Sequence, residues 1–303
     1  MSSSVATTGK VPASAKAALS IACFLWAISF IATKVAVASV PPLTLVTLRL
    51  LISSLCFFVW FVIRGSKLKY EGLPWLGQMF LLSLFGTGLH YSTQTIGLKY
   101  TTASNASLYA VTGPVTILII AVLFLGEKLT VKKAAGLILA LTGVITVMGI
   151  KTLASFDVKG HMLGDLLVFA SIFMWGVFTV LGKNMTKRMN ALELTAIVTF
   201  IGSLCMIPFG WYETRASSFP ILSIGRDAWI AIAFLGITCS FLATLLYFKA
   251  LERTESQKVG VYLYTIPPMT YIIASFYLGE KIGANLIIGS LLVLAGVYIT
   301  ENG

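Results

Sequence analysis

The sequence predicts an all-α polytopic membrane protein whose ten transmembrane helices form two inverted five-helix repeats. Hydrophobic residues make up 57% of the chain and charged residues only 11%, and the mean hydropathy is +0.92. Soluble domains carry about 25% charged residues. Apolar runs of about 20 residues recur along the whole length, and such a run spans a hydrocarbon core of about 30 Å. The chain therefore belongs in a bilayer.

The second observation is a near-duplication, because residues 98–147 are repeated at 251–300 with a constant offset of 153. A further match, at an offset of 149, aligns the first helix of each half. Two halves that each cross the membrane an odd number of times must have opposite orientations, so we expect inverted repeats. The matched positions are Leu125-Gly126-Glu127-Lys128 with Leu278-Gly279-Glu280-Lys281, Gly136 and Gly143 with Gly289 and Gly296, Trp26 with Trp175, and Lys34 with Lys183.

The helices follow the apolar runs in order. Residues 1–16 are polar and rich in Ser, Thr and Ala, which predicts a disordered cytoplasmic tail. The apolar stretch from Ala17 is longer than the core of a cleavable signal, so it is read as a retained first helix. The first repeat then covers 17–150 and the second 151–303. We expect the ten helices at 17–38, 43–63, 75–98, 102–125, 132–150, 162–183, 192–212, 228–251, 256–278 and 284–300.

The distribution of basic residues predicts the orientation. A net charge of +11 could indicate a nucleic-acid partner. The Lys and Arg residues instead gather in alternate loops, with the excess on the side of the N-terminus, which is the positive-inside pattern of membrane proteins. We therefore expect both termini in the cytoplasm, the lipid bilayer as the surrounding partner, and no nucleic acid.

Several short motifs together resemble those of the EamA-type transporters of the drug/metabolite transporter superfamily, over roughly residues 17–300. The resemblance implies a central cavity between two inverted repeats, and export or exchange of small metabolites such as amino acids, in a bacterial inner membrane. The second half departs from the pattern, because it has no Pro-Pro pair at 190–191 and has Lys258 in place of Asn105. The motifs are Trp26, Ser29-Phe30, Lys34, Pro41-Pro42, Arg49, Leu98-Lys99-Tyr100-Thr101, Ala103, Ala106, Pro114, Leu125-Gly126-Glu127-Lys128, Gly136 and Gly143.

The 11 acidic residues all lie in loops or at the ends of the expected helices. A carboxylate in the middle of the membrane is costly and usually marks a proton relay or an ion site. We therefore expect facilitated, gradient-driven transport or exchange without carboxylate-based ion coupling. Neither a cofactor nor a metal is expected. The cysteines match no metal motif and are expected to be small buried hydrophobes, at Cys23, Cys56, Cys205 and Cys239.

The third helix carries the polar sequence His90-Tyr91 followed by Gln94. The spacing of four residues places His90 and Gln94 on one face. Lipid cannot satisfy these groups, so the face is expected to turn inward. Contact with a solute in the cavity is one interpretation, and a hydrogen bond between helices is the other.

Trp26 and Trp175 occupy equivalent positions near the middle of their helices, although tryptophan usually prefers the membrane interface. We interpret them as a cavity wall whose indole N–H groups need partners, with simple packing as the alternative. The remaining cavity candidates are Asn105, Tyr109, Thr179, Tyr247 and Tyr262.

Tyr109 and Tyr262 are equivalent in the repeat and could form an aromatic box for an amphipathic or cationic solute. Ordinary core tyrosines are the alternative. Pro114 and Pro267 are also equivalent, and a proline inside a helix removes a backbone hydrogen bond and kinks it. We expect paired hinges at these prolines, with a static kink as the alternative.

Lys34 and Arg49 lie near the outer ends of the first two helices. Either cation could attract a substrate carboxylate or gate the outer mouth. The alternatives are a side chain that extends to the interface and capping of carbonyl groups. The two Leu-Gly-Glu-Lys turns are read as structural connectors. Helices five and ten are expected to pack tightly through their paired glycines, and could form a dimer surface.

The leading interpretation is a secondary carrier for small zwitterionic or amphipathic organic solutes, with its site at the midplane between the repeats. A membrane enzyme would need a nucleophile with a base, a metal cluster or paired acids, and the sequence indicates none of these. A lipid flippase or a non-transporting membrane partner is the remaining class.

Overall fold

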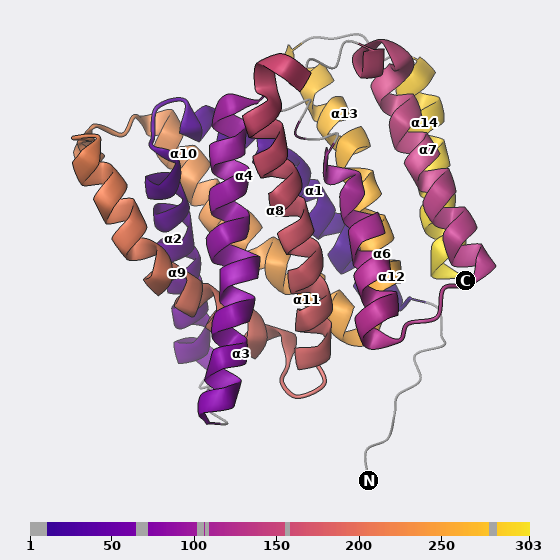
Figure 1. Ribbon diagram of the computed structural model, residues 1–303, viewed down its shortest axis with the longest axis horizontal. Coiled ribbons are helices and arrows are strands. Elements are labelled where there is room, and N and C mark those ends of the chain that lie inside the picture. Colours follow the sequence, from indigo (N-terminus) through magenta and orange to yellow (C-terminus); the bar gives the residue numbers. More distant parts are fainter. Residues whose placement is uncertain (1–10, 65–71, 102–105, 107–108, 155–157, 279–283) are drawn as a thin grey trace.

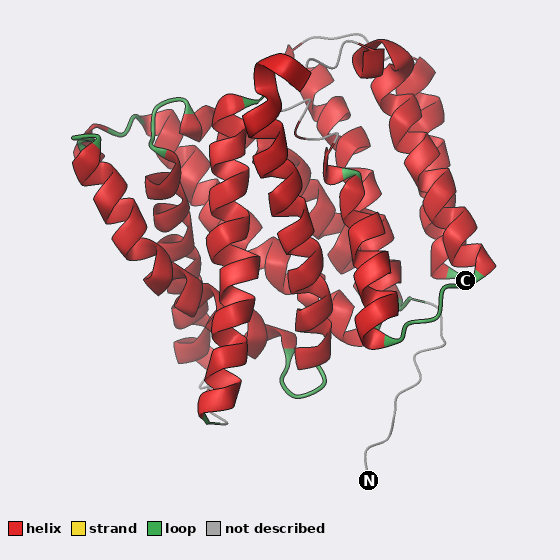
Figure 2. Cartoon of the chain, in the orientation of Figure 1, coloured by secondary structure: helices red, strands yellow, loops and turns green. Residues whose placement is uncertain are grey.

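The computed structural model describes residues 11–64, 72–101, 106, 109–154, 158–278 and 284–303. This part of the chain consists of helices joined by short loops and contains no strand (Figures 1 and 2). The sequence-based prediction of an all-α membrane protein is confirmed. By length and composition, six helices in the described residues could cross a membrane: Ala13–Val37, Pro42–Ile63, Met162–Met185, Ala191–Ala216, Arg226–Arg253 and Ala284–Glu301.

The N-terminal half comprises α1 (Ala13–Val37), α2 (Pro42–Arg64), α3 (Leu73–Ser83), α4 (Leu89–Tyr100), α6 (Thr112–Leu125) and α7 (Val131–Ala154). The C-terminal half comprises α8 (Val158–Met185), α9 (Ala191–Ala216), α10 (Arg226–Phe234), α11 (Thr244–Arg253), α12 (Ser256–Gly260), α13 (Ile266–Leu278) and α14 (Ala284–Glu301). Between these helices lie two π-helical segments, η1 (Leu84–Gly88) and η3 (Leu235–Ala243), and two 3-10 segments, η2 (Ile221–Ser223) and η4 (Val261–Thr265). The segments η1 and η3 change the hydrogen-bond pattern without breaking the helix, so α3 continues through η1 into α4 and α10 continues through η3 into α11.

Local chemistry sets several helix boundaries. Pro42 begins α2, where its missing N–H has no helical partner to lose. Asn190 caps α9 by accepting a hydrogen bond from the Glu193 backbone N–H at 2.9 Å, and the Glu193 carboxylate accepts from the Asn190 N–H. Gly126 ends α6 with a φ of +65°, a left-handed conformation that glycine adopts without strain.

The two halves pack on each other helix by helix. α2 lies along α9, α4 along α8, α1 along α11, and α7 along α14 at one edge of the molecule (Figure 1). Paired glycines allow the last of these contacts. A Cβ on Gly143 would lie 2.7 Å from the Gly289 carbonyl oxygen, and a Cβ on Gly296 would lie 2.5 Å from that of Gly136. The expected close packing of these two helices through small residues is confirmed.

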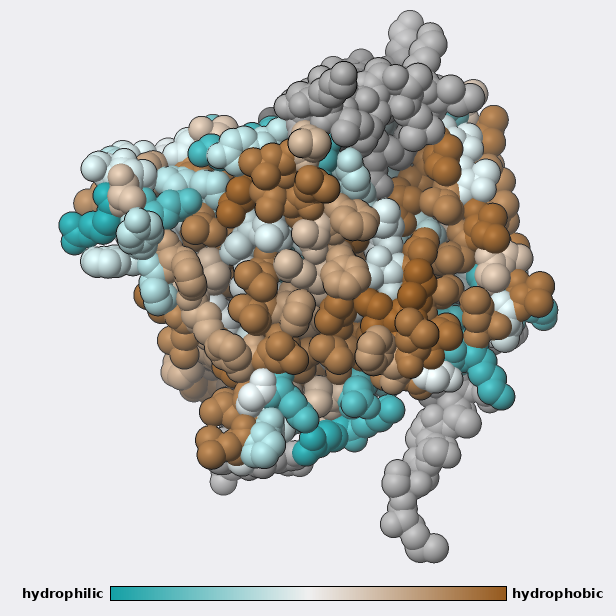
Figure 3. Space-filling view, in the orientation of Figure 1, coloured by the Kyte–Doolittle hydropathy of each residue, from teal (hydrophilic) through white to brown (hydrophobic). Residues whose placement is uncertain are grey.

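Large apolar side chains face outward along the sides of the bundle. Leu55, Phe124 and Leu291 are all more than half exposed. Figure 3 shows a hydrophobic band across the middle of the visible face, with hydrophilic residues gathered toward its edges. A bilayer would cover such a band, so the fold is that of an integral membrane protein.

We use the name terminal end for the end of the bundle where α1 begins and α14 ends, and opposite end for the other.

Candidate functional site

A pocket of about 70 Å³ lies where helices of both halves meet. Sites for small molecules usually measure about 300–1,000 Å³, so the pocket is smaller than a typical site. Polar and aromatic side chains come from α1, α2, α4 and α8, and the other lining residues come from α8, from the start of α6 and the segment just before it, and from η4 and α13. The lining residues are Trp26, Ser29, Phe30, Arg49, His90, Tyr91, Gln94, Ala110, Gly113, Ile172, Trp175, Leu263 and Ile266.

The tryptophans that the repeat aligns form one wall of this pocket. Trp26 on α1 and Trp175 on α8 meet edge to face, with ring centroids 5.1 Å apart and planes at 83°. Tyr247 on α11 packs behind them, with centroid distances of 5.2 Å to Trp26 and 5.4 Å to Trp175. Each favourable ring pair contributes about 0.5–1.5 kcal/mol beyond its buried area. The aromatic wall is therefore fixed in place by its own packing.

His90 connects the pocket to the interface between α4 and α8. Its Nδ1 lies 2.8 Å from the carbonyl oxygen of Ser171. A carbonyl only accepts, so Nδ1 carries the proton and donates it. The imidazole ring also lies 5.2 Å from Trp175, measured between ring centroids. His90 thus lines the pocket and at the same time makes an interhelical hydrogen bond.

Arg49 lies on the wall of the pocket and is only 2% exposed. Its Nε donates a hydrogen bond to the Ser240 hydroxyl of η3 at 3.0 Å. Its Cζ stands 4.0 Å from the centroid of the Tyr91 ring on α4, which is a cation–π contact. Three elements, α2, α4 and η3, therefore hold the guanidinium in one position.

Four of the expected cavity residues lie outside the pocket wall, and Asn105 lies outside the described residues. Thr179 is fully buried and shares a hydrogen bond with the Tyr247 hydroxyl at 3.2 Å, so this pair supports the tryptophans from behind. Tyr109 packs edge-on against Phe169. The Tyr262 hydroxyl donates to the Glu301 carboxylate near the end of α14, which places Tyr262 toward the terminal end.

Lys34 and Lys183 cap helix ends rather than lining the pocket. The Nζ of Lys34, in the last turn of α1, donates to the carbonyl oxygens of Leu98 at 2.7 Å and Thr101 at 2.8 Å. The Nζ of Lys183, in the last turn of α8, makes bonds of 2.6 Å and 2.7 Å to the carbonyl oxygens at the repeat-equivalent residues, Leu251 and Thr254. These ammonium groups satisfy carbonyls that a helix C-terminus leaves without partners.

The two expected hinge prolines stand at the starts of helices. Pro114 is in the first turn of α6, and Pro267 is in the first turn of α13, directly after the 3-10 segment η4. A proline in a first turn breaks no helical hydrogen bond. Pro267 therefore follows a change from 3-10 to α-helix, and the role of both prolines as hinges stays a prediction.

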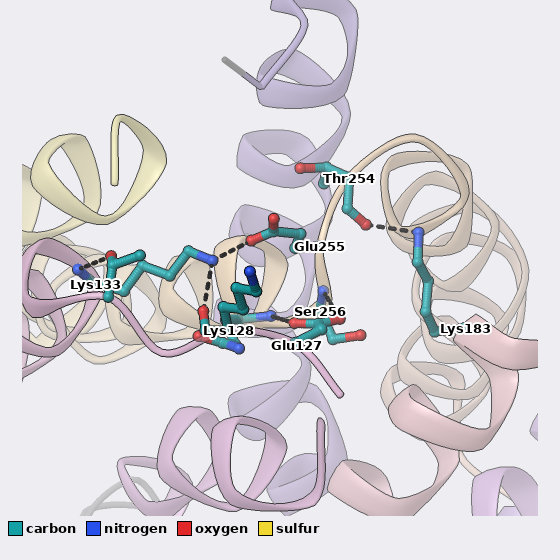
Figure 4. Close-up of polar contacts among 9 residues, drawn as sticks. Glu127, Lys128, Lys133, Lys183, Thr254, Glu255 and Ser256 are labelled. Carbon is teal, nitrogen blue, oxygen red and sulfur yellow. Dashed lines mark hydrogen bonds and ion pairs between the residues drawn. The ribbon is translucent and has the colours of Figure 1, made fainter. Parts of the chain in front are cut away.

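A polar cluster joins the halves at the terminal end (Figure 4). The Glu127 carboxylate accepts hydrogen bonds from the backbone N–H groups of Ser256 at 2.8 Å and Gln257 at 3.2 Å, and so caps α12. The Lys133 ammonium pairs with the Glu255 carboxylate and also donates to the Lys128 carbonyl oxygen at 3.0 Å. The first Leu-Gly-Glu-Lys turn, read from sequence as a connector, therefore also holds a helix of the other half.

Sequence reasoning missed several residues of the pocket. Ser29 and Phe30 could have been found, because they follow Trp26 by three and four residues and share its helix face. Ile172 precedes Trp175 by three residues and shares its face for the same reason. Leu263 and Ile266 carry no chemical signal, and only the folded chain places them at the pocket.

The fold and this pocket define a polytopic helical membrane protein with a small polar and aromatic pocket between two halves. The family model for the EamA-like transporter family matches residues 14–149 and 162–301, so the chain belongs to that family. This membership identifies a transporter of small solutes rather than an enzyme.

Relatives agree with this assignment, and a solved structure shares the fold. An uncharacterized transporter of Archaeoglobus fulgidus is 33% identical over 282 residues, covering 93% of this chain and 95% of the relative. The uncharacterized transporter YoaV of Bacillus subtilis is 24% identical over 275 residues, covering 91% and 92%. A solved crystal structure shares the fold, with a TM-score of 0.76 and 21% identity, over 95% of this chain and 97% of that chain.

Proposed function

We propose that this protein is a secondary transporter that moves small amphipathic organic solutes, amino acids among them, across the membrane by alternating access. One observation carries the proposal: the pocket between the halves, where the rings of Trp26 and Trp175 lie beside the polar side chains of His90 and Gln94. A site with apolar faces and a few placed polar groups suits a solute that is itself part apolar and part polar.

Two features support an inverted relation between residues 17–150 and 151–303. Lys34 and Lys183 bind equivalent carbonyl pairs, but Lys34 does so at the opposite end of the bundle and Lys183 at the terminal end. The helix contacts are also exchanged between the halves, because α4 packs on α8 while α11 packs on α1. A twofold axis in the membrane plane, as in inverted-repeat transporters, produces both relations.

The contacts at the terminal end suit a closed gate on that side. Glu127 and Lys133 come from the first half, and their partners on α12 and at Glu255 come from the second. We infer that these contacts separate when the halves rock, which opens the pocket to the terminal end and widens it for the solute. We propose that this end faces the cytoplasm, with both termini, in a bacterial inner membrane, and the excess of basic residues on the side of the termini supports this orientation.

Transport is proposed as export or exchange, driven by the gradient of the solute. Counterflow into liposomes that contain the purified protein tests it. Vesicles loaded with an unlabelled amino acid should accumulate the labelled form transiently, and protein-free vesicles should not. A thermal-shift screen of the purified protein selects the amino acids and related metabolites for this assay.

Protein-dependent scrambling of a fluorescent phospholipid, without counterflow of any solute that stabilises the protein, would contradict the proposal and favour a lipid flippase.

A further inference from the structure

We propose that Arg49 recognises the carboxylate of a small organic solute that carries a single carboxylate group, and that it makes this transporter specific for solutes with such a group. The inference rests on the proposed function and names the substrate class for the same pocket. It starts from the placement of a 2% exposed guanidinium on the pocket wall.

The bonds of Arg49 leave its outer edge available. A guanidinium has five N–H donors, of which one is on Nε and four are on the Nη atoms. Nε donates to Ser240. Within the described residues the Nη groups make no hydrogen bond, and one face of the guanidinium lies over the Tyr91 ring. The paired Nη edge is the part that recognises a carboxylate through two parallel hydrogen bonds.

The charge of Arg49 has no carboxylate partner among the described residues. The ion pairs formed by those residues, Lys16 with Glu301 and Lys133 with Glu255, lie at the terminal end. A cation at membrane depth is costly, and such residues usually pair or mark a substrate path. The Tyr91 ring and the Ser240 hydroxyl offset part of this cost. A bound anion would supply the remaining partner.

The surroundings favour one negative charge on an apolar body. Among the described residues that line the pocket, Arg49 is the only lysine or arginine. A phosphate dianion would therefore leave a net charge buried, whereas a carboxylate would not. Trp26 and Trp175 offer ring surface to the rest of the solute beside it. The combination selects small monocarboxylates with an apolar or aromatic body.

Both partners of Arg49 are placed by unusual backbone. Ser240 lies inside the π-helical segment η3, and Tyr91 lies in α4, three residues after the end of the π-helical segment η1. π-helical turns inside α-helices are rare and often occur at functional sites. The π-helical segments help to position the two side chains that contact the guanidinium of Arg49. The position of Arg49 therefore depends on η1 and η3 as well as on its own helix.

The aligned position in the other half carries no cation. At the offset of 149 that aligns Trp26 with Trp175, Arg49 corresponds to Val198, which is 1% exposed on α9. The same helix position is therefore filled by an apolar residue in the other half. The carboxylate is bound by the first half only, which orients the solute in the pocket.

Pairs of solutes that differ only in this group test the inference on the wild-type protein. We would measure binding of phenylacetate against phenylacetamide, and of 3-methylbutanoate against 3-methylbutanamide, by titration calorimetry in detergent and by counterflow in liposomes. The carboxylate of each pair should bind at least tenfold more tightly than its amide, because charge-assisted bidentate bonds are lost in the amide. Competition by inorganic phosphate should be weak.

Variants locate the effect at Arg49. Arg49→Met should remove the preference for the carboxylate, so that acid and amide bind with affinities within about twofold of each other. Arg49→Lys keeps the charge but loses the planar fork, and should retain a reduced preference. Lys34→Met is the control, because it removes a cation that lies outside the pocket and should leave the preference unchanged.

Each result decides between the inference and its alternatives. Equal binding of acids and amides by the wild-type protein, or an unchanged preference in Arg49→Met, overturns the role of Arg49 while the transporter stands. Counterflow of neutral solutes without any binding of the carboxylates does the same. Failure of every solute in counterflow instead overturns the proposed function. If Arg49→Met does not fold, the wild-type comparison and Arg49→Lys still decide the question.

Discussion

Trp26 and Trp175 touch, with ring centroids 5.1 Å apart, although 149 residues separate them in the chain. They occupy the same position in the two sequence repeats. Equivalent residues of two halves related by a twofold axis can meet only on that axis. The contact therefore supports the proposed inverted relation of the halves, whose axis would pass beside the pocket.

The first prediction concerns this aromatic wall. Trp26→Ala and Trp175→Ala should each weaken solute binding by up to about tenfold, because each removes ring contacts of about 0.5–1.5 kcal/mol from the pocket. Gln94→Ala should also weaken solute binding, because it removes a polar side chain from the pocket wall. The measurement is the solute-induced rise in melting temperature of the purified protein. Trp211→Ala is the control, because Trp211 is 63% exposed on α9 and should bind solute as the wild type does. Normal binding and transport in all three pocket variants would show that the pocket is not the site.

The second prediction concerns Glu127. Glu127→Gln should weaken the cap on α12, because a neutral amide oxygen accepts the Ser256 and Gln257 N–H bonds less strongly than a carboxylate. Hydrogen–deuterium exchange at residues 254–260 should then be faster, and the terminal end should open more often. Mass spectrometry of peptides from this segment measures the effect.

Glu213→Gln is a matched control for that experiment. The Glu213 carboxylate accepts a hydrogen bond from the Thr44 backbone N–H at 2.8 Å at the opposite end of the bundle. Its loss should speed exchange at the start of α2 and leave residues 254–260 unchanged. If residues 254–260 exchange at the same rate in Glu127→Gln and in the wild type, Glu127 does not contribute to the gate.

The third prediction concerns the glycine contact between α7 and α14. Gly296→Ala should lower the stability by about 1–3 kcal/mol, because the added Cβ would lie 2.5 Å from the Gly136 carbonyl oxygen and the Ala140 nitrogen. The melting temperature of the protein in detergent reports the loss. In the same assay Gly77→Ala, whose Cβ would have nothing within 4 Å, should be neutral or stabilising by up to about 1 kcal/mol. Two equally stable variants would mean that the helices separate easily.

The fourth prediction concerns the two lysine caps. Lys34→Met and Lys183→Met should each destabilise the protein by about 1–3 kcal/mol, because two carbonyl groups lose their donor in a part-buried setting. Thermal unfolding in detergent measures this. Lys99→Met is the comparison, since Lys99 is exposed at the end of α4. This variant should have the same melting temperature as the wild type. A drop in solute affinity without a drop in stability would instead place Lys34 on the solute path.

Much of the site was accessible from sequence because chemistry marked it. His90 and Gln94 are polar in an apolar helix, and Trp26 and Trp175 recur at mid-helix, so each signalled a place that lipid does not satisfy. Tyr262 gave a similar signal, yet its hydroxyl binds Glu301 near the terminal end. A polar group in a membrane helix needs a partner, but the sequence does not say whether that partner is a solute or another helix.

The sequence by itself determined the helical membrane class, the internal repeat and the identity of the polar groups inside the helices. These follow from hydropathy and from spacing, which are local properties of the chain. Only the tertiary structure decided that Arg49 lines the pocket, where it contacts the Tyr91 ring and donates a hydrogen bond to Ser240. It also decided that Lys34 donates hydrogen bonds to two carbonyl groups instead. Both are cations near the ends of neighbouring helices, and their partners lie far away in the chain. Which partner a long side chain reaches depends on how helices of the two halves pack, and that is a property of the folded bundle alone.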